Sequence, residues 1–87
     1  MKTNSIQRQH ELEKKIISAI ETFFEDYEIP NKVLVAISPD LSDAKVVTSR
    51  ASAFDNDETY NWLVEEIDTH NLSDNVSEVA SYYFDVR

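Results

Sequence analysis

Residues 33–51, VLVAISPDLSDAKVVTSRA, form the stretch that decides the fold. Residues 33–38 are a short apolar run bounded by turn-forming residues, which is typical of a buried strand. Residues 39–43 (PDLSD) predict a loop, and residues 45–51 begin with the β-branched side chains that strands favour. Two strands separated by such a short loop predict an antiparallel hairpin.

A long amphipathic helix is predicted on the N-terminal side of this hairpin, over residues 6–27. Its apolar side chains recur at steps of four, four, three and four residues, which places them on one helix face. Pro30 ends the helix because proline cannot continue it. The apolar positions are Leu12, Ile16, Ile20, Phe23 and Tyr27.

A second helix is predicted on the C-terminal side of the hairpin, over residues 55–70. Residues 55–58 (DNDE) offer side-chain acceptors and negative charge for the free amides of a helix start. The expected buried face consists of Tyr60, Leu63, Val64 and Ile67.

The last segment fits two structures. Val76, Val79, Ala80 and Tyr83 have helical spacing, whereas residues 79–86 alternate as a strand does, and their aromatic and β-branched composition favours the strand. A third strand also makes the hairpin a viable sheet. The sequence therefore predicts one α+β domain over residues 1–87, a small two-layer structure in the order α-β-β-α-β, with an antiparallel sheet and two helices on one of its faces. The alternative order is α-β-β-α-α.

Glycine and cysteine are both absent from the 87 residues. Phosphate-binding loops, dinucleotide fingerprints and nucleophile elbows all need glycine where the backbone approaches its ligand. Without cysteine, neither disulfides nor thiolate metal sites can form. These absences exclude the common nucleotide-binding motifs and thiol chemistry.

The charge is strongly asymmetric along the chain. The formal net charge is −9, yet residues 1–50 contain seven bases and eight acids, whereas residues 51–86 contain no Lys or Arg. The acids of this second part are Asp55, Asp57, Glu58, Glu65, Glu66, Asp68, Asp74, Glu78 and Asp85. Such a surface repels phosphates and anionic membranes and attracts a basic protein surface. Simple solvation and adaptation to high salt are the alternative interpretations.

No motif for catalysis or metal binding accompanies this charge. His10 and His70 lie in polar surroundings with no partner motif, so we expect surface histidines. Asp55 begins a spacing that resembles a calcium loop, but Tyr60 stands where that loop needs glycine. We therefore expect no enzyme activity, no cofactor and no metal. The longest apolar stretches are far too short to cross a membrane, and a cytoplasmic location is expected.

Trp62 is the most suggestive single residue. On the predicted helix it lies outside the apolar stripe, on an acidic face, which is the composition of an interface anchor. The alternative is that the chain covers it. The predicted partner-binding residues are Asp55, Asp57, Glu58, Trp62, Glu65, Glu66, Asp68, Asp74 and Glu78.

These features suggest an acidic protein-binding module. Its partner would be a protein with a basic surface. In a more specific hypothesis the partner is a nucleic-acid-binding protein, and the module inhibits it by mimicking the charge of nucleic acid. In size, acidity and lack of cysteine the chain resembles phage anti-CRISPR and anti-restriction proteins, a likeness of composition without a shared motif. The alternative hypothesis is a non-catalytic structural or assembly protein that forms a homo-oligomer, for instance a homodimer, and uses its acids only for solubility.

Overall fold

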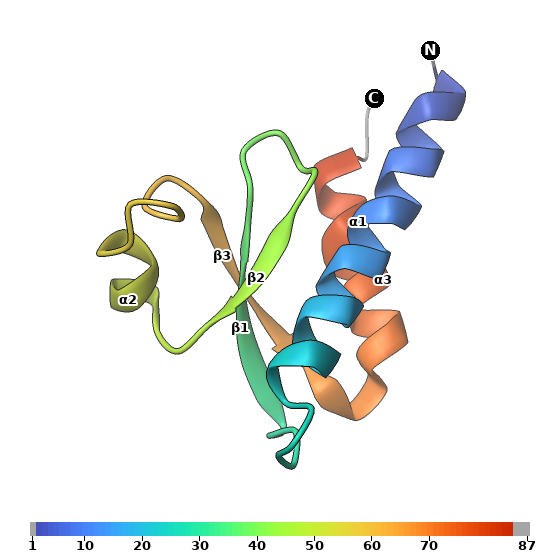
Figure 1. The fold of residues 1–87 in the computed structure, drawn as a ribbon. Helices are drawn as coiled ribbons and strands as arrows, with labels where there is room; N and C mark the ends of the chain where they lie inside the picture. Colours follow the sequence, from blue (N-terminus) through green and yellow to red (C-terminus); the bar gives the residue numbers. More distant parts are fainter. Residues whose placement is uncertain (1, 85–87) are drawn as a thin grey trace.

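The computed structural model describes the backbone of residues 2–84 and the side chains of residues 6–84. Two long helices and a three-stranded sheet make up most of it, joined by a short helix and a single 3-10 turn (Figure 1). The elements are α1 (Lys2–Phe23), β1 (Lys32–Ile37), β2 (Ala44–Val47), α2 (Arg50–Phe54), β3 (Leu63–Asp68), η1 (Thr69–Asn71) and α3 (Leu72–Phe84).

The sheet is antiparallel, with β1 in the centre and the order β2-β1-β3. Val35 of β1 lies opposite Val46 on one side and Glu65 on the other. Because successive side chains of a strand point to opposite faces, Val33, Val35 and Ile37 share one face with Ile67 of β3. All four side chains of this face are at most 5 % exposed.

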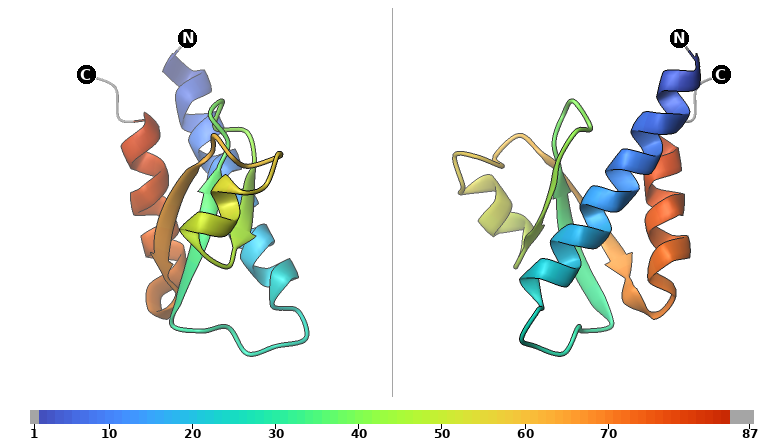
Figure 2. Two further views of the ribbon diagram at one scale, coloured as in Figure 1. Left: turned by 90° about the vertical axis from the view of Figure 1, so that its left-hand side faces the viewer. Right: turned by 45° about the vertical axis from the view of Figure 1, so that its right-hand side comes forward.

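Helices α1 and α3 cover that buried face side by side (Figures 1 and 2). The helical spacing of α1 places its apolar stripe against the sheet, so Leu12, Ile16 and Ile20 are at most 1 % exposed. Val76 and Ala80, one turn apart on α3, complete the core from the second helix. The core therefore lies between the two helices and one face of the sheet.

The outer face of the sheet is covered only in part, by α2 and the turns that follow it (Figure 2, left). Ala36 points away from α1 and α3 yet has 0 % exposure, and Ala53 of α2, the helix on this side of the sheet, is also buried (Figure 2, left). A reciprocal cap starts α2: the Ser49 hydroxyl accepts from the Ser52 amide at 3.0 Å, and the Ser52 hydroxyl accepts from the Ser49 amide at 3.1 Å.

The structure confirms the predicted α+β class and the antiparallel sheet, and two helices cover one face of it, although the second is α3 and not the predicted helix over residues 55–70. The predicted order α-β-β-α-β matches the first five elements, and α3 follows them. The hairpin is confirmed with slightly earlier strands, Lys32–Ile37 and Ala44–Val47.

Two assignments of residues were wrong. The expected helix over residues 55–70 is replaced by turns, β3 and η1, while the short α2 occupies the end of the expected second strand. Residues 72–84, expected to contribute the last strand, form α3, as the alternative order had it. The expected strand positions 85 and 86 lie outside the described residues.

The first helix differs from its prediction mainly at its end. It begins at Lys2 and stops at Phe23, where turns take over, so it never reaches Tyr27. Tyr27 is consequently 76 % exposed, and Phe23 is 49 % exposed. Within the described part of the chain, no helix combines the length and apolar character that crossing a membrane requires.

Candidate interaction surface

The connection formed by residues 50–62 folds back on itself as a compact unit. The Thr59 hydroxyl donates to the Ala53 carbonyl at 2.8 Å, and the Asn56 amide donates to the same oxygen at 3.3 Å. Thr59 is only 3 % exposed, so its hydroxyl holds the turn against the end of α2 from inside. Trp62 closes the unit through its amide, which donates to the Thr59 carbonyl at 2.9 Å.

Two basic side chains tie the 50–62 connection to the sheet. Lys45 of β2 forms an ion pair with Glu58, and Arg50 donates to the Val64 carbonyl of β3 at 3.1 Å. These contacts attach the connection to both edge strands. Since they join exposed side chains, they position the connection more than they stabilise the fold.

The 50–62 connection contains both exposed aromatic groups and exposed carboxylates. Phe54 is 67 % exposed and Tyr60 is 58 % exposed. Phe54 directly follows Ala53 and Tyr60 directly follows Thr59, the two residues that a hydrogen bond joins, so both aromatic residues belong to the same compact turn. Asp55 and Asp57 are exposed beside them, and Trp62 is half-buried. We call Phe54, Asp55, Asp57, Tyr60 and Trp62 the turn surface.

Sequence reasoning found only part of the turn surface. It selected Trp62 on the geometry of a helix that does not exist there, because Trp62 lies in the bend before β3. It placed Tyr60 in the core, which is wrong, and it did not select Phe54. An aromatic residue directly before the acidic run Asp55–Glu58 was the available signal.

The remaining predicted acids are spread over the molecule. Glu66 and Asp68 project from the outer face of β3, the side of the sheet on which α2 lies, whereas Glu65 points toward α3. Asp74 and Glu78 are exposed on α3, across the sheet from α2. The structure therefore brings together only Asp55, Asp57, Glu58 and Trp62 of the predicted set, all within one connection.

Two of these acids have structural partners. The Asp68 carboxylate accepts from the His70 amide at 2.9 Å and caps η1. Glu65 is half-buried beneath α3, where its carboxylate accepts a hydrogen bond from the Tyr83 hydroxyl. Burial, together with this contact and the negative charge of Glu65, raises the pKa of Tyr83 well above its usual range.

The Tyr83 contact predicts a specific dependence of stability on pH. Because the folded pKa is raised, the folded protein keeps this proton at pH values where the unfolded chain has released it. The contribution of Tyr83 to the free energy of unfolding is therefore complete below pH 10.0, which equals the ordinary tyrosine pKa, and it declines as the pH rises above this value.

We expect Tyr83→Phe to lower the free energy of unfolding by about 1 kcal/mol at neutral pH, since Glu65 loses its donor. We also expect this variant to lose less stability than the native chain above pH 10.0, measured by urea unfolding at increasing pH. Tyr82→Phe is the matched control, since Tyr82 is 76 % exposed on the same helix. Identical alkaline profiles for the native chain and Tyr83→Phe would contradict the prediction.

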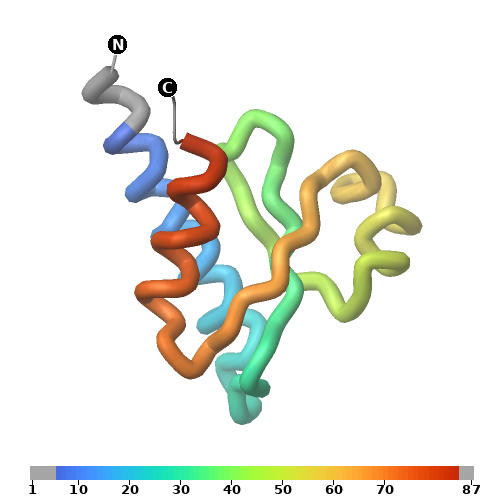
Figure 3. The backbone as a smooth tube through the Cα atoms, turned by 180° about the vertical axis from the view of Figure 1, so that it is seen from behind, coloured from blue at the N-terminus to red at the C-terminus, as the bar shows by residue number. Residues whose placement is uncertain are grey.

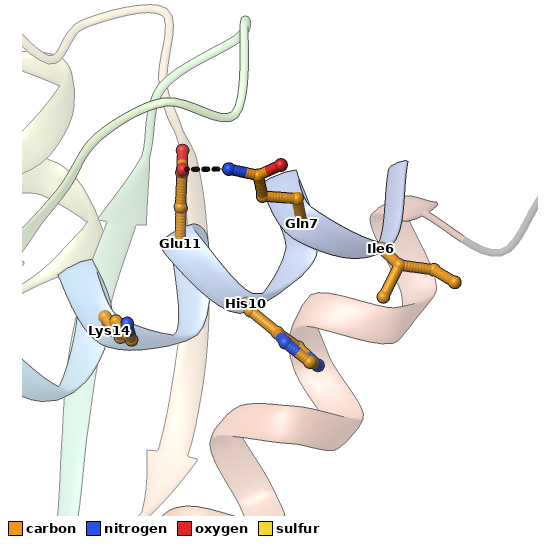
Figure 4. Close-up of a pocket in the computed structure, with 5 residues that line it drawn as sticks. All are labelled: Ile6, Gln7, His10, Glu11 and Lys14. Atoms are coloured by element: carbon orange, nitrogen blue, oxygen red, sulfur yellow. Dashed lines mark hydrogen bonds between the residues drawn. The ribbon is translucent and has the colours of Figure 1, made fainter. Parts of the chain in front are cut away.

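A shallow hollow runs along the outside of α1 (Figure 4). All its lining residues belong to this one helix, and Gln7 and Glu11 are joined by a long hydrogen bond of 3.4 Å. His10 is exposed there and points away from the Glu11 carboxylate (Figure 4). No second element encloses the hollow, so it offers neither an acid–base pair nor a bound position for a substrate.

Among residues 2–84, no group of three or more His, Asp or Glu side chains is arranged to hold a metal ion. Comparisons of the chain with protein-family models, with curated proteins and with solved structures give no match. The functional argument therefore depends on the residues of the chain alone.

Proposed function

We propose that this chain is a non-catalytic protein-binding module that docks onto a basic protein surface through its turn surface. The observation that carries the proposal is the exposure of Phe54 and Tyr60 in the same connection as Asp55 and Asp57. Large aromatic groups are frequent anchors of interface hot spots, and the rim around such anchors is polar. The carboxylates select a basic partner and accelerate the encounter, and the aromatic rings supply the lasting contact.

The more specific form of the proposal is an inhibitor that occupies the nucleic-acid site of its partner by mimicking phosphate charge. It is supported by the 36 residues, 51–86, that contain nine acids and no base. A phosphate-binding site offers lysine and arginine side chains at its surface, and these would meet the turn surface.

The test is capture of partners from lysate of the source cells, with matched variants. We expect Phe54→Ala/Tyr60→Ala to weaken retention of the partner by at least about 30-fold, since truncated hot spots cost 2 kcal/mol or more. Asp55→Lys/Asp57→Lys should weaken it most strongly at low salt, because screening removes the charge contribution at high salt.

Asp74→Lys/Glu78→Lys changes the net charge by the same amount on α3 and serves as the control. Equal losses from the two charge reversals would show that overall charge, and not the turn surface, attracts the partner. If the captured partner binds nucleic acid, competition between this chain and that nucleic acid tests the inhibitor form directly.

Self-association is the second candidate, because β3 is an edge strand and Tyr82 on the neighbouring α3 is 76 % exposed. A homodimer through this edge would show a mass that rises with concentration in sedimentation equilibrium. A mass of 10.0 kDa at all concentrations would exclude it.

A further inference from the structure

A groove of about 370 Å³ lies at the opposite end of the sheet from the β1–β2 loop, away from the turn surface. Phe23 and Phe24 form one wall at the end of α1, with their rings edge to face at 4.8 Å. Pro30 and side chains of β1 and β2 form the rest. The walls are thus mainly apolar, and the half-exposed Phe23 leaves the groove open to solvent.

The floor of the groove is a piece of β1 that lacks a neighbouring strand. β2 ends at Val47, which lies opposite Leu34, so the described chain places no strand beside Lys32 on this side. The N–H and C=O groups of successive strand residues point to alternate sides. The Asn31 carbonyl accepts from the Thr69 amide on the β3 side at 2.8 Å, so the backbone groups of Lys32 point to the groove.

The same alternation holds at the other end of β1. The Ser38 amide donates to the Asp43 carbonyl at 3.0 Å on the β2 side. Ser38 and Lys32 are an even number of residues apart, so the backbone groups of Lys32 point to this same side. Lys32 also lines the groove. Its amide and carbonyl are therefore available to an extended chain that continues the line of β2.

The groove is bordered by a strongly acidic turn. Its wall residues Phe24 and Pro30 are joined by residues 25–29, in which Glu25, Asp26 and Glu28 are all exposed. This turn lies at the end of the molecule where β3 passes into α3 (Figure 3). Lys32, which lines the groove, has the acidic Asp68 as its register partner on β3. The border therefore attracts positive charge.

We propose that this groove binds an extended basic segment of another protein as a short added strand beside β1. The segment pairs its backbone with Lys32, inserts an apolar side chain against Phe23 and Phe24, and places flanking lysine or arginine side chains near Glu25 and Glu28. Strand addition gains affinity from main-chain hydrogen bonds and specificity from alternate side-chain pockets. This site is independent of the turn surface, and the chain can use either surface without the other.

The probe is the fluorescein-labelled peptide Arg-Lys-Val-Ile-Lys-Arg, with binding followed by fluorescence anisotropy at low salt. We expect Phe23→Ala, and separately Glu25→Lys/Glu28→Lys, to weaken binding by at least about tenfold. Asp55→Lys/Asp57→Lys alters the net charge equally on the turn surface and should leave binding within about twofold. Equal weakening by both charge reversals would overturn the proposal, and so would equal binding of Glu-Glu-Val-Ile-Glu-Glu.

A second pair of variants tests the backbone pairing. Lys32→Ala keeps the amide and should bind the peptide at least as well as the native chain, because it removes a positive charge. Lys32→Pro removes the amide donor and should bind at least about tenfold more weakly than Lys32→Ala. Thermal unfolding of both variants establishes that they are folded. Equal binding by the two folded variants would overturn the strand addition.

The oligomeric state separates the proposal from its main competitor. Three results together would show that the groove is a contact between copies of the chain and that the proposal is wrong. These are a dimeric native chain, a monomeric Phe23→Ala variant and no binding of the peptide. Retention of peptide binding by Phe54→Ala/Tyr60→Ala supports the proposal, and shows that the groove functions even where the turn surface does not.

Discussion

Ile67→Ala is expected to lower the free energy of unfolding by about 3 kcal/mol, the cost of deleting a buried isoleucine and leaving a cavity. Ile67 has 0 % exposure and belongs to the core cluster, where it lies opposite Val33 in the strand register. The loss is a large part of the stability of a domain this small. Urea unfolding followed by circular dichroism measures it.

Leu63→Ala is the matched control, and it distinguishes two structures of this segment. In a helix, Leu63 and Ile67 are one turn apart on the same buried face, and both substitutions would cost several kcal/mol. In β3 they share a face too, but Leu63 lies at the end of the strand and is 49 % exposed. We expect a loss of about 1 kcal/mol or less for Leu63→Ala. Equal losses would favour the helix.

The spacing of Leu63 and Ile67 explains why the sequence predicted a helix here. A separation of four residues fits a helix turn and also fits strand alternation, because four is an even number. In β3, Glu65 lies between them and places a carboxylate on the apolar face of the strand. Its partner Tyr83 is 18 residues away, and the contact that satisfies Glu65 exists only after α3 has packed.

The same ambiguity affects the last segment, where Val76, Ala80 and Phe84 fit both periods. In the structure Val79 and Tyr83 pack against the core beside Val76 and Ala80, and these four positions share one face only in a helix. By contrast, the apolar pattern of α1 contains a step of three residues, from Ile20 to Phe23, which fits a helix but not a strand, and the prediction of α1 was right. Long regular patterns were thus predictable, whereas short segments depended on tertiary contacts that override propensity.

The turn surface was predictable in composition but not in geometry. The acidic run around Asp55 and Asp57 and the large ring of Trp62 were visible in the sequence. That run was interpreted as a helix start because acidic side chains stabilise free amides there. In the structure, Asn56 instead accepts from the Glu58 amide at 2.8 Å in a turn, while the Ser49–Ser52 cap starts the helix earlier.

Ser38→Ala is expected to lower the free energy of unfolding by about 2 kcal/mol, because it leaves the Asp43 amide without its acceptor and removes one of the two acceptors of the Ser42 amide. The Ser38 hydroxyl is buried and accepts from the amides of Ser42 at 3.1 Å and Asp43 at 3.0 Å. It also donates to the Asp40 carboxylate at 2.7 Å. Ser38 and Asp40 thus organise the loop together, since the Asp40 carboxylate also accepts from the Ser42 amide at 3.2 Å.

This organisation matters because the loop holds the bulky Leu41 at a φ of 62°, in the left-handed conformation that glycine or asparagine adopts more easily. Left-handed geometry costs such a residue about 1–2 kcal/mol. The hydrogen bonds around Ser38 offset that cost, so their removal should also loosen Leu41, which packs against the core.

Ser42→Ala is the matched control, since it removes a second hydroxyl that donates to Asp40, at 2.7 Å, from an exposed position. We expect a loss of about 0.5 kcal/mol or less. A similar loss from both substitutions would show that the bonds to Asp40, and not the backbone donors, stabilise the loop.

The pH dependence offers an independent measurement of the same loop. Hydrogen bonds from Ser38 and then Ser42 lower the pKa of Asp40 below 3.8. A lowered folded pKa contributes stability above the unfolded pKa, and this stability is lost as the pH falls through the folded pKa. In Ser38→Ala the pKa of Asp40 should rise toward 3.8, and the variant should lose less stability than the native chain in strong acid. An NMR titration that finds the pKa of Asp40 unchanged in this variant would show that Ser38 does not hold the carboxylate.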